Sequence, residues 1–132
     1  MSARRRFLGL SLSGLALIGI YSCNAPYIPV PPPASPTFAA ITVSDGMGGT
    51  KRVWETQGPA VPAAANAKVY VYNASIETGV IAKARADGSY LADPIDGQPG
   101  DQIQISYETP QREASPILCR LLVEGLATEN CP

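Results

Sequence analysis

The feature that most constrains this chain is a series of short apolar or alternating runs from Thr37 onward, separated by turn-forming residues. Turn signals about every 8–12 residues with a period-two pattern are typical of an all-β sandwich or barrel. The only helical element expected is one turn at residues 63–65. The seven candidate strands cover residues 38–43, 51–56, 68–73, 80–86, 90–95, 103–107 and 117–123.

The alternation also predicts which side chains face the core. Val69 and Val71 share one face of their strand, while Lys68, Tyr70 and Tyr72 share the other. An inward row is expected at Val80, Ala82, Ala84 and Ala86, and another at Ile103 and Ile105, whereas Asp87-Gly88 is a hairpin signal.

The stretch from Ala67 to Glu108 resembles bacterial Ig-like and carboxypeptidase-regulatory-like β-sandwich domains. Its elements are a Val-x-Val strand, an Ala-rich strand leading into Asp87-Gly88-Ser89-Tyr90, and Gly100-Asp101 before Ile103-x-Ile105. The resemblance implies a single Greek-key Ig-like β-sandwich over residues 37–132, with the Tyr90 ring in its core. Domains of this kind serve as spacers, adhesin modules and accessory binding domains, mostly without catalytic residues, and fold alone does not define function.

The first 22 residues have the three-part pattern of a signal peptide. Arg4, Arg5 and Arg6 form a basic start, Phe7–Ile20 is an uncharged apolar run of 14 residues, and Ser22 is a small residue before a cysteine. A spanning helix needs roughly 20 apolar residues, so an uncleaved membrane anchor is the less favoured alternative.

The sequence Ile20-Tyr21-Ser22-Cys23 resembles the bacterial lipobox. That resemblance implies cleavage before Cys23, three acyl chains carried by this cysteine, and a lasting membrane tether. Ordinary secretory cleavage near Ser22 is the alternative. An exported protein anchored in the bacterial envelope is therefore expected. Asn24 after the lipidated cysteine resembles an outer-membrane sorting preference, which favours the outer membrane over the inner.

Arg4-Arg5-Arg6-Phe7-Leu8 also resembles the twin-arginine export motif. Such a signal is an address read by a receptor, and it implies export of an already folded domain. An ordinary general-secretion signal that contains three arginines is an equal alternative.

Residues 23–36 are predicted to form a stalk. Six of the 13 residues from Asn24 to Pro36 are prolines, which favours an extended polyproline II segment of up to roughly 40 Å. A docking ligand for a proline-reading module is the alternative interpretation.

Composition excludes several functions. The chain has no histidine, which excludes serine–histidine–aspartate and cysteine–histidine catalysis and histidine-based zinc sites. Without the three N-terminal arginines, 7 basic and 11 acidic residues remain, a net charge of −4. Lys51-Arg52 is then the only adjacent basic pair, so neither nucleic acid nor anionic lipid is an expected partner.

Cys119 and Cys131 are candidates for a disulfide bond, because an exported location permits one and Cys23 is assigned to lipid. A buried thiol at Cys119 beside an unpaired Cys131 is the alternative.

Four carboxylates, those of Asp87, Asp93, Asp96 and Asp101, fall close together around glycines. A calcium site is one interpretation, but their spacing does not follow an EF-hand, and turn formation is favoured. No metal or cofactor is predicted.

Tyr70 and Tyr72 are the candidate binding face, for a protein or a glycan, with cross-strand packing as the alternative. The predicted function is a tethered structural or binding module of the envelope, not an enzyme. The competing hypothesis, a small glycan-acting enzyme, needs Asp93 or Glu108 beside a second carboxylate in a groove.

Overall fold

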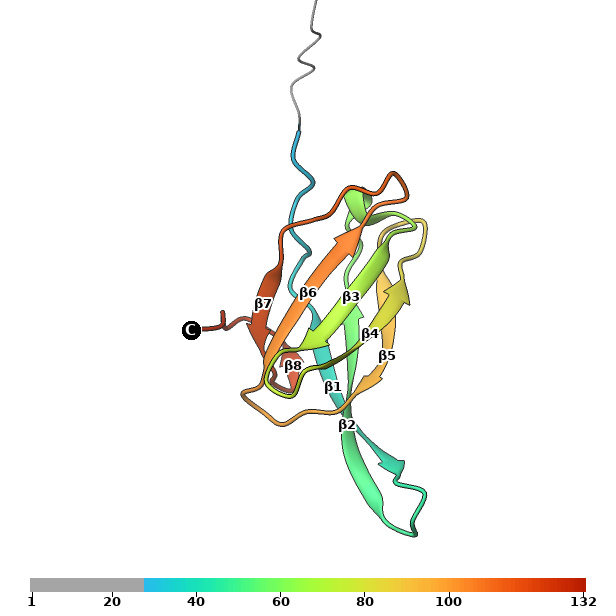
Figure 1. Ribbon diagram of the computed structural model, residues 1–132, viewed down its shortest axis with the longest axis vertical. Helices are drawn as coiled ribbons and strands as arrows, with labels where there is room; N and C mark the ends of the chain where they lie inside the picture. The colour runs from blue at the N-terminus through green and yellow to red at the C-terminus, as the bar shows by residue number, and fades with distance from the viewer. Residues whose placement is uncertain (1–27) are drawn as a thin grey trace, which may run out of the picture.

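The computed structural model describes residues 28–132 (Figure 1). The predictions for the signal peptide, for the export motif at Arg4–Leu8 and for lipidation of Cys23 lie outside these residues. Within residues 28–132 there is no helix long and apolar enough to cross a bilayer.

The described chain folds into two packed antiparallel sheets of four strands each, which confirms the all-β sandwich. We call β5-β2-β1-β8 sheet A and β4-β3-β6-β7 sheet B. The strands are β1 (Thr37–Ser44), β2 (Thr50–Gly58), β3 (Lys68–Asn73), β4 (Thr78–Lys83), β5 (Tyr90–Ile95), β6 (Gln102–Glu108), β7 (Leu118–Leu121) and β8 (Gly125–Leu126), with one 3-10 turn at Pro62–Ala64.

The strand order makes the sandwich a Greek key. The chain changes sheets between β2 and β3, between β4 and β5, between β5 and β6, and between β7 and β8. In the lettering used for Ig-like sandwiches, β1, β2 and β5 correspond to strands A, B and E, and β3, β6 and β7 to strands C, F and G. The order β5-β2-β1 is then E-B-A, and the order β3-β6-β7 is C-F-G, with β4 beside β3. The short β8, which the sequence pattern did not predict, pairs with Thr37 and Phe38 of β1.

The predicted hairpin at Asp87-Gly88 is wrong. β4 ends at Lys83 in sheet B and β5 begins at Tyr90 in sheet A, so this turn links the two sheets instead of pairing adjacent strands. The turn itself forms, with Gly88 at a φ of 85°. An Asp-Gly turn reverses the chain locally, but the sheet that β5 joins is set by its apolar side chains, which cover the core beside β2.

The core lies between the sheets and has most of the predicted inward residues, but Ala86 is exposed because β4 ends at Lys83. Val69, Val71, Ile103 and Ile105 are at most 1% exposed, and Tyr90 also belongs to the core. Sheet A contributes Phe38, Trp54 and Ile95 from the opposite side.

The N-terminal boundary differs from the predicted stalk. Val30, Pro33 and Pro36 are buried against the domain. The Tyr107 hydroxyl donates to the Pro31 carbonyl oxygen at 2.6 Å, and the Ala127 N–H donates to the Pro36 carbonyl oxygen at 2.9 Å. Prolines can pack this way because they have no N–H to leave unpaired. The sandwich therefore begins near Val30, and residues 30–36 are part of it, not of a free stalk.

Candidate functional site

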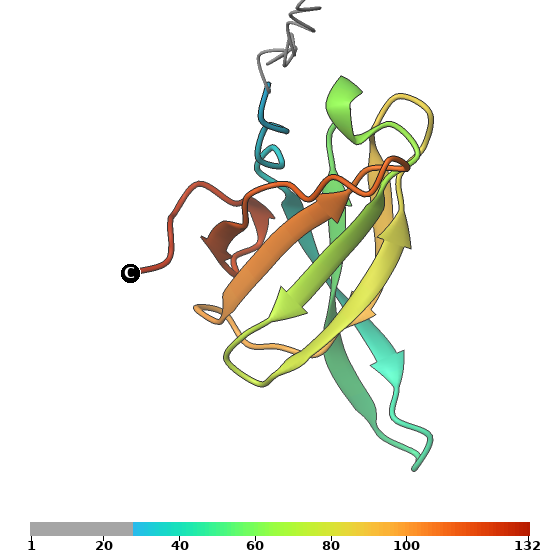
Figure 2. The same ribbon diagram turned by 45° about the horizontal axis from the view of Figure 1, so that its top comes forward.

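The outer face of sheet B is open to solvent in the described structure (Figure 2). Because alternate residues of β3 face the core, Lys68, Tyr70 and Tyr72 point outward, as the alternation predicts. Tyr70 lies opposite Ile81 of β4 on one side and Ser106 of β6 on the other. The two tyrosines are therefore in the middle of this face.

Tyr72 and its neighbours form a shallow apolar depression. Tyr72 lies opposite Gly79, and a Cβ atom added at Gly79 would be 3.1 Å from the Tyr72 Cδ2 atom. The ring thus covers the bare backbone of Gly79 and remains 37% exposed. Ile81 is 62% exposed and Tyr70 is half-buried. Cross-strand packing explains part of this arrangement, but it leaves a contiguous apolar surface uncovered.

A deeper pocket of about 500 Å³ lies where β3 begins. We call it the cation pocket, because Lys68, Lys83 and Arg112 are among its lining residues. Asn66, Ile81, Glu108 and Thr109 also line it. Ile81 lines both the cation pocket and the tyrosine depression, so the two are adjacent on this face. The sequence pattern indicated that Lys68 faces outward but did not identify this pocket.

The enzyme hypothesis requires Asp93 or Glu108 beside a second carboxylate in a groove, and the described structure places neither residue in this way. Glu108 lines the cation pocket, whose lining includes no second carboxylate. Asp93 is exposed on β5 in sheet A. The paired acids that glycoside hydrolysis needs are therefore not assembled by these residues.

The four clustered aspartates take part in separate local contacts. The Asp101 carboxylate accepts hydrogen bonds from the Asn73 side-chain amide and the Gln98 N–H, each at 2.9 Å. Asp96 forms a salt bridge with Lys51 at 3.1 Å, and Asp93 is solvent-exposed. Across residues 28–132, no three potential His, Cys, Asp or Glu ligands form a group suited to a metal.

Asp87 stabilises the turn between the two sheets. Its carboxylate accepts hydrogen bonds from the Ser89 hydroxyl at 2.6 Å and the Ser89 N–H at 2.9 Å. These hydrogen bonds favour the charged form and hold the pKa of the Asp87 carboxyl below its usual value.

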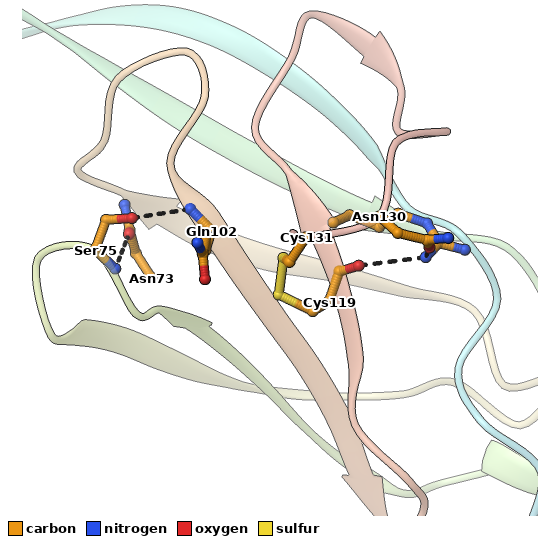
Figure 3. The surroundings of a disulfide bond; sticks show 7 residues. Asn73, Ser75, Gln102, Cys119, Asn130 and Cys131 are labelled. Carbon is orange, nitrogen blue, oxygen red and sulfur yellow. Dashed lines mark hydrogen bonds between the residues drawn. A yellow bond between two sulfur atoms is a disulfide. The ribbon is translucent and has the colours of Figure 1, made fainter.

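Cys119 and Cys131 form a disulfide bond in the structure (Figure 3). Their Cα atoms are 5.5 Å apart, and the bond joins β7 to the C-terminal tail. Next to this bond, the Arg120 guanidinium donates hydrogen bonds to the Asn130 side chain in the tail and to the Ser35 hydroxyl in the N-terminal segment. Both ends of the described chain are thus fastened to the same edge of sheet B.

Comparisons with known proteins give no assignment. No protein-family model, curated protein or solved structure matches the chain.

Proposed function

We propose that this protein is a lipoprotein tethered in a bacterial envelope, where it serves as a binding or structural module for a protein or glycan. The observation that carries the proposal is the uncovered outer face of sheet B, with Tyr70, Tyr72 and Ile81 side by side. Aromatic rings with a polar tip are enriched at contact surfaces, because they give large contact area at a low cost in conformational entropy.

The N-terminal sequence supports the tether. The apolar run and the lipobox-like residues before Cys23 suit cleavage and acylation at that cysteine. Since Val30 packs on the sandwich, the seven residue steps from Cys23 can span at most about 25 Å. The domain would therefore be held close to the membrane surface, at a shorter distance than a stalk up to Pro36 would allow.

The tether is tested by replacing the lipidated residue. Cys23→Ala should move the protein out of the membrane fraction, and mass spectrometry of the native mature N-terminus should find acyl groups on Cys23. Ser22→Ala is the matched control, because it keeps a small residue before the cysteine and should leave the protein in the membrane. A Cys23→Ala protein that still sediments with membranes would refute the lipid anchor.

The binding face is tested by cross-linking in cells. A photoreactive phenylalanine at position 72 should trap a protein or a glycan, because Tyr72 is exposed on the face. The same group at Met47 is the control: that residue is 91% exposed but lies in the loop between β1 and β2 of sheet A, which projects beyond the sandwich at the bottom of Figure 1. Equal cross-linking at both positions, or none at position 72, would contradict the proposal.

A further inference from the structure

The basic residues of the described chain divide into two groups. Four have partners: Lys51 pairs with Asp96, Arg52 with Glu124, Arg85 bonds Ser89, and Arg120 bonds Ser35. The other three, which are Lys68, Lys83 and Arg112, have no salt bridge or side-chain hydrogen bond within residues 28–132. All three line the cation pocket.

Strand register forces two of these cations together. Lys68 lies directly opposite Lys83 in the β3–β4 pair. Like charges at directly opposite positions of an antiparallel pair destabilise it. Glu108 lies on the other side of Lys68, yet the two form no salt bridge. The fold therefore holds two like charges side by side, and a bound anion would relieve their repulsion.

The rim of the pocket has an unusual backbone. Asn66 and Arg112 have φ angles of 56° and 65°, and they are two of the three non-glycine residues with positive φ in the described chain. A turn holds Arg112 in this conformation: its N–H donates to the Thr109 carbonyl oxygen at 2.8 Å, and the Thr109 hydroxyl accepts from the Glu113 N–H at 3.1 Å. Such backbone conformations cost free energy and cluster at ligand sites.

We propose that the cation pocket binds an acidic sugar residue of a glycan. This inference rests on the proposed function and specifies the ligand of the same face. Lys68, Lys83 and Arg112 would hold the carboxylate of the sugar through charge-assisted hydrogen bonds. The carboxylate of Glu108, the amide of Asn66 and the hydroxyl of Thr109 supply acceptors and donors for ring hydroxyls.

The shape of the face favours a glycan over a lipid headgroup. Ile81 lies at the border of the pocket and the tyrosine depression, and β3 runs about 13 Å from Lys68 to Tyr72. An extended oligosaccharide could follow this path and stack on the Tyr72 ring. Glu108 can accept hydrogen bonds from the sugar hydroxyls next to the bound carboxylate.

The net charge restricts acidic ligands to this pocket. Residues 23–132 have a net charge of −4, so the protein as a whole repels polyanions. Lys51 and Arg52, the adjacent basic pair, are already matched by Asp96 and Glu124. The cation pocket is the place on the described surface where three basic side chains without a salt bridge or side-chain hydrogen bond lie together.

Isothermal titration calorimetry of the full chain in detergent tests the inference with tetragalacturonate as probe and uncharged maltotetraose as control. We expect tetragalacturonate to bind more tightly than maltotetraose, and we expect its binding to weaken as the salt concentration is raised. Lys68→Ala and Arg112→Ala should each weaken its binding about fivefold or more, as expected for loss of a charged hydrogen-bond partner. Glu108→Gln should strengthen it, because a like charge is removed.

Lys51→Ala is the matched control, since it removes the same charge from sheet A and should leave the affinity for tetragalacturonate unchanged. Circular dichroism and thermal unfolding verify that every variant is folded. If Lys51→Ala weakens binding as much as Lys68→Ala does, the attraction is non-specific and the inference is overturned.

Other outcomes separate this inference from the proposed function. Equal binding of both oligosaccharides, lost in Tyr72→Ala, would overturn the acidic-sugar inference and leave a glycan-binding module. If tetragalacturonate does not bind and a protein is cross-linked at position 72, the acidic-sugar inference is overturned and a protein-binding module remains. Lys68-dependent binding to phosphatidylglycerol vesicles without binding of tetragalacturonate would overturn it in favour of a lipid headgroup.

Discussion

Tyr90→Phe is expected to stabilise the domain. The Tyr90 side chain is in the core, and its hydroxyl is buried without a hydrogen-bond partner within the described chain. The ring is tightly held: a Cβ atom added at Gly58 would be only 1.9 Å from the Tyr90 Cε1 atom. Phenylalanine should therefore occupy the same position without the hydroxyl.

The size of the effect follows from the environment of the hydroxyl. A buried polar group without a partner costs about 1–3 kcal/mol. The cavity beside the ring has a volume of about 10 Å³ and is lined mainly by apolar groups such as Val61, Ala64 and Val69. That space is marginal for one water molecule and offers it few polar partners. Allowing for the lost van der Waals contacts of one oxygen atom, we expect a gain of about 1 kcal/mol.

Alkaline pH should enlarge the difference. Burial raises the pKa of the Tyr90 hydroxyl above its ordinary value of 10.0. Above about pH 10 the unfolded chain therefore loses this proton while the folded chain keeps it, so wild-type stability falls as pH rises. Between neutral pH and pH 11 the advantage of Tyr90→Phe should grow by about 1.4 kcal/mol.

Urea unfolding at neutral pH and at pH 11, monitored by Trp54 fluorescence, measures both effects. The midpoint should rise for Tyr90→Phe with an unchanged slope, which shows a change in stability and not in the unfolded state. Burial also raises the pKa of Tyr107, but this residue is common to both proteins and its contribution cancels. A loss of 1 kcal/mol or more on removing the hydroxyl would refute the reasoning, because it would mean that the hydroxyl has a partner.

Three other changes test the fold. Cys119→Ser with Cys131→Ser should cost about 3 kcal/mol and lower the melting temperature by about 12 °C, because the bond closes a short loop; scanning calorimetry would show it, with reduced wild type as control. Gly88→Ala should cost at least about 3 kcal/mol in urea unfolding, because φ is 85° and its Cβ would be 1.9 Å from the Val61 carbonyl oxygen. Tyr107→Phe should cost about 1 kcal/mol and increase amide hydrogen exchange at Ala127, which is bonded to the N-terminal segment that this hydroxyl holds. Unchanged stability in any of these variants would contradict the contact it removes.

The parts of the fold that sequence could predict are those that alternation specifies locally. β3 has the predicted bounds, Lys68–Asn73, because its inward valines and outward tyrosines repeat with the two-residue period of a strand. The inward row of Ile103 and Ile105 follows for the same reason. In each case the hydrophobic side chains alone determine which face is buried.

Elements defined by a distant partner could not be predicted in this way. β8 has only two residues, Gly125 and Leu126, which is too short for any periodicity, and it exists because β1 offers it backbone partners. A proline-rich run has the same composition whether it is a free stalk or packed on a domain. The burial of Val30 and Pro36 depends on contacts with residues far along the chain, near Tyr107 and Ala127.

The cation pocket also could not be predicted from sequence, because its residues come together only on folding. A search for basic residues adjacent in sequence finds Lys51-Arg52, but the structure matches both of them with acids. Lys68, Lys83 and Arg112 are dispersed along the chain, and they meet only because the register of β3 with β4 and the turn after β6 place them together. Register and turn geometry thus decide which charges remain available to a ligand. The site proposed for this chain is therefore identified by charge that folding leaves without a partner, and not by charge that is clustered in its sequence.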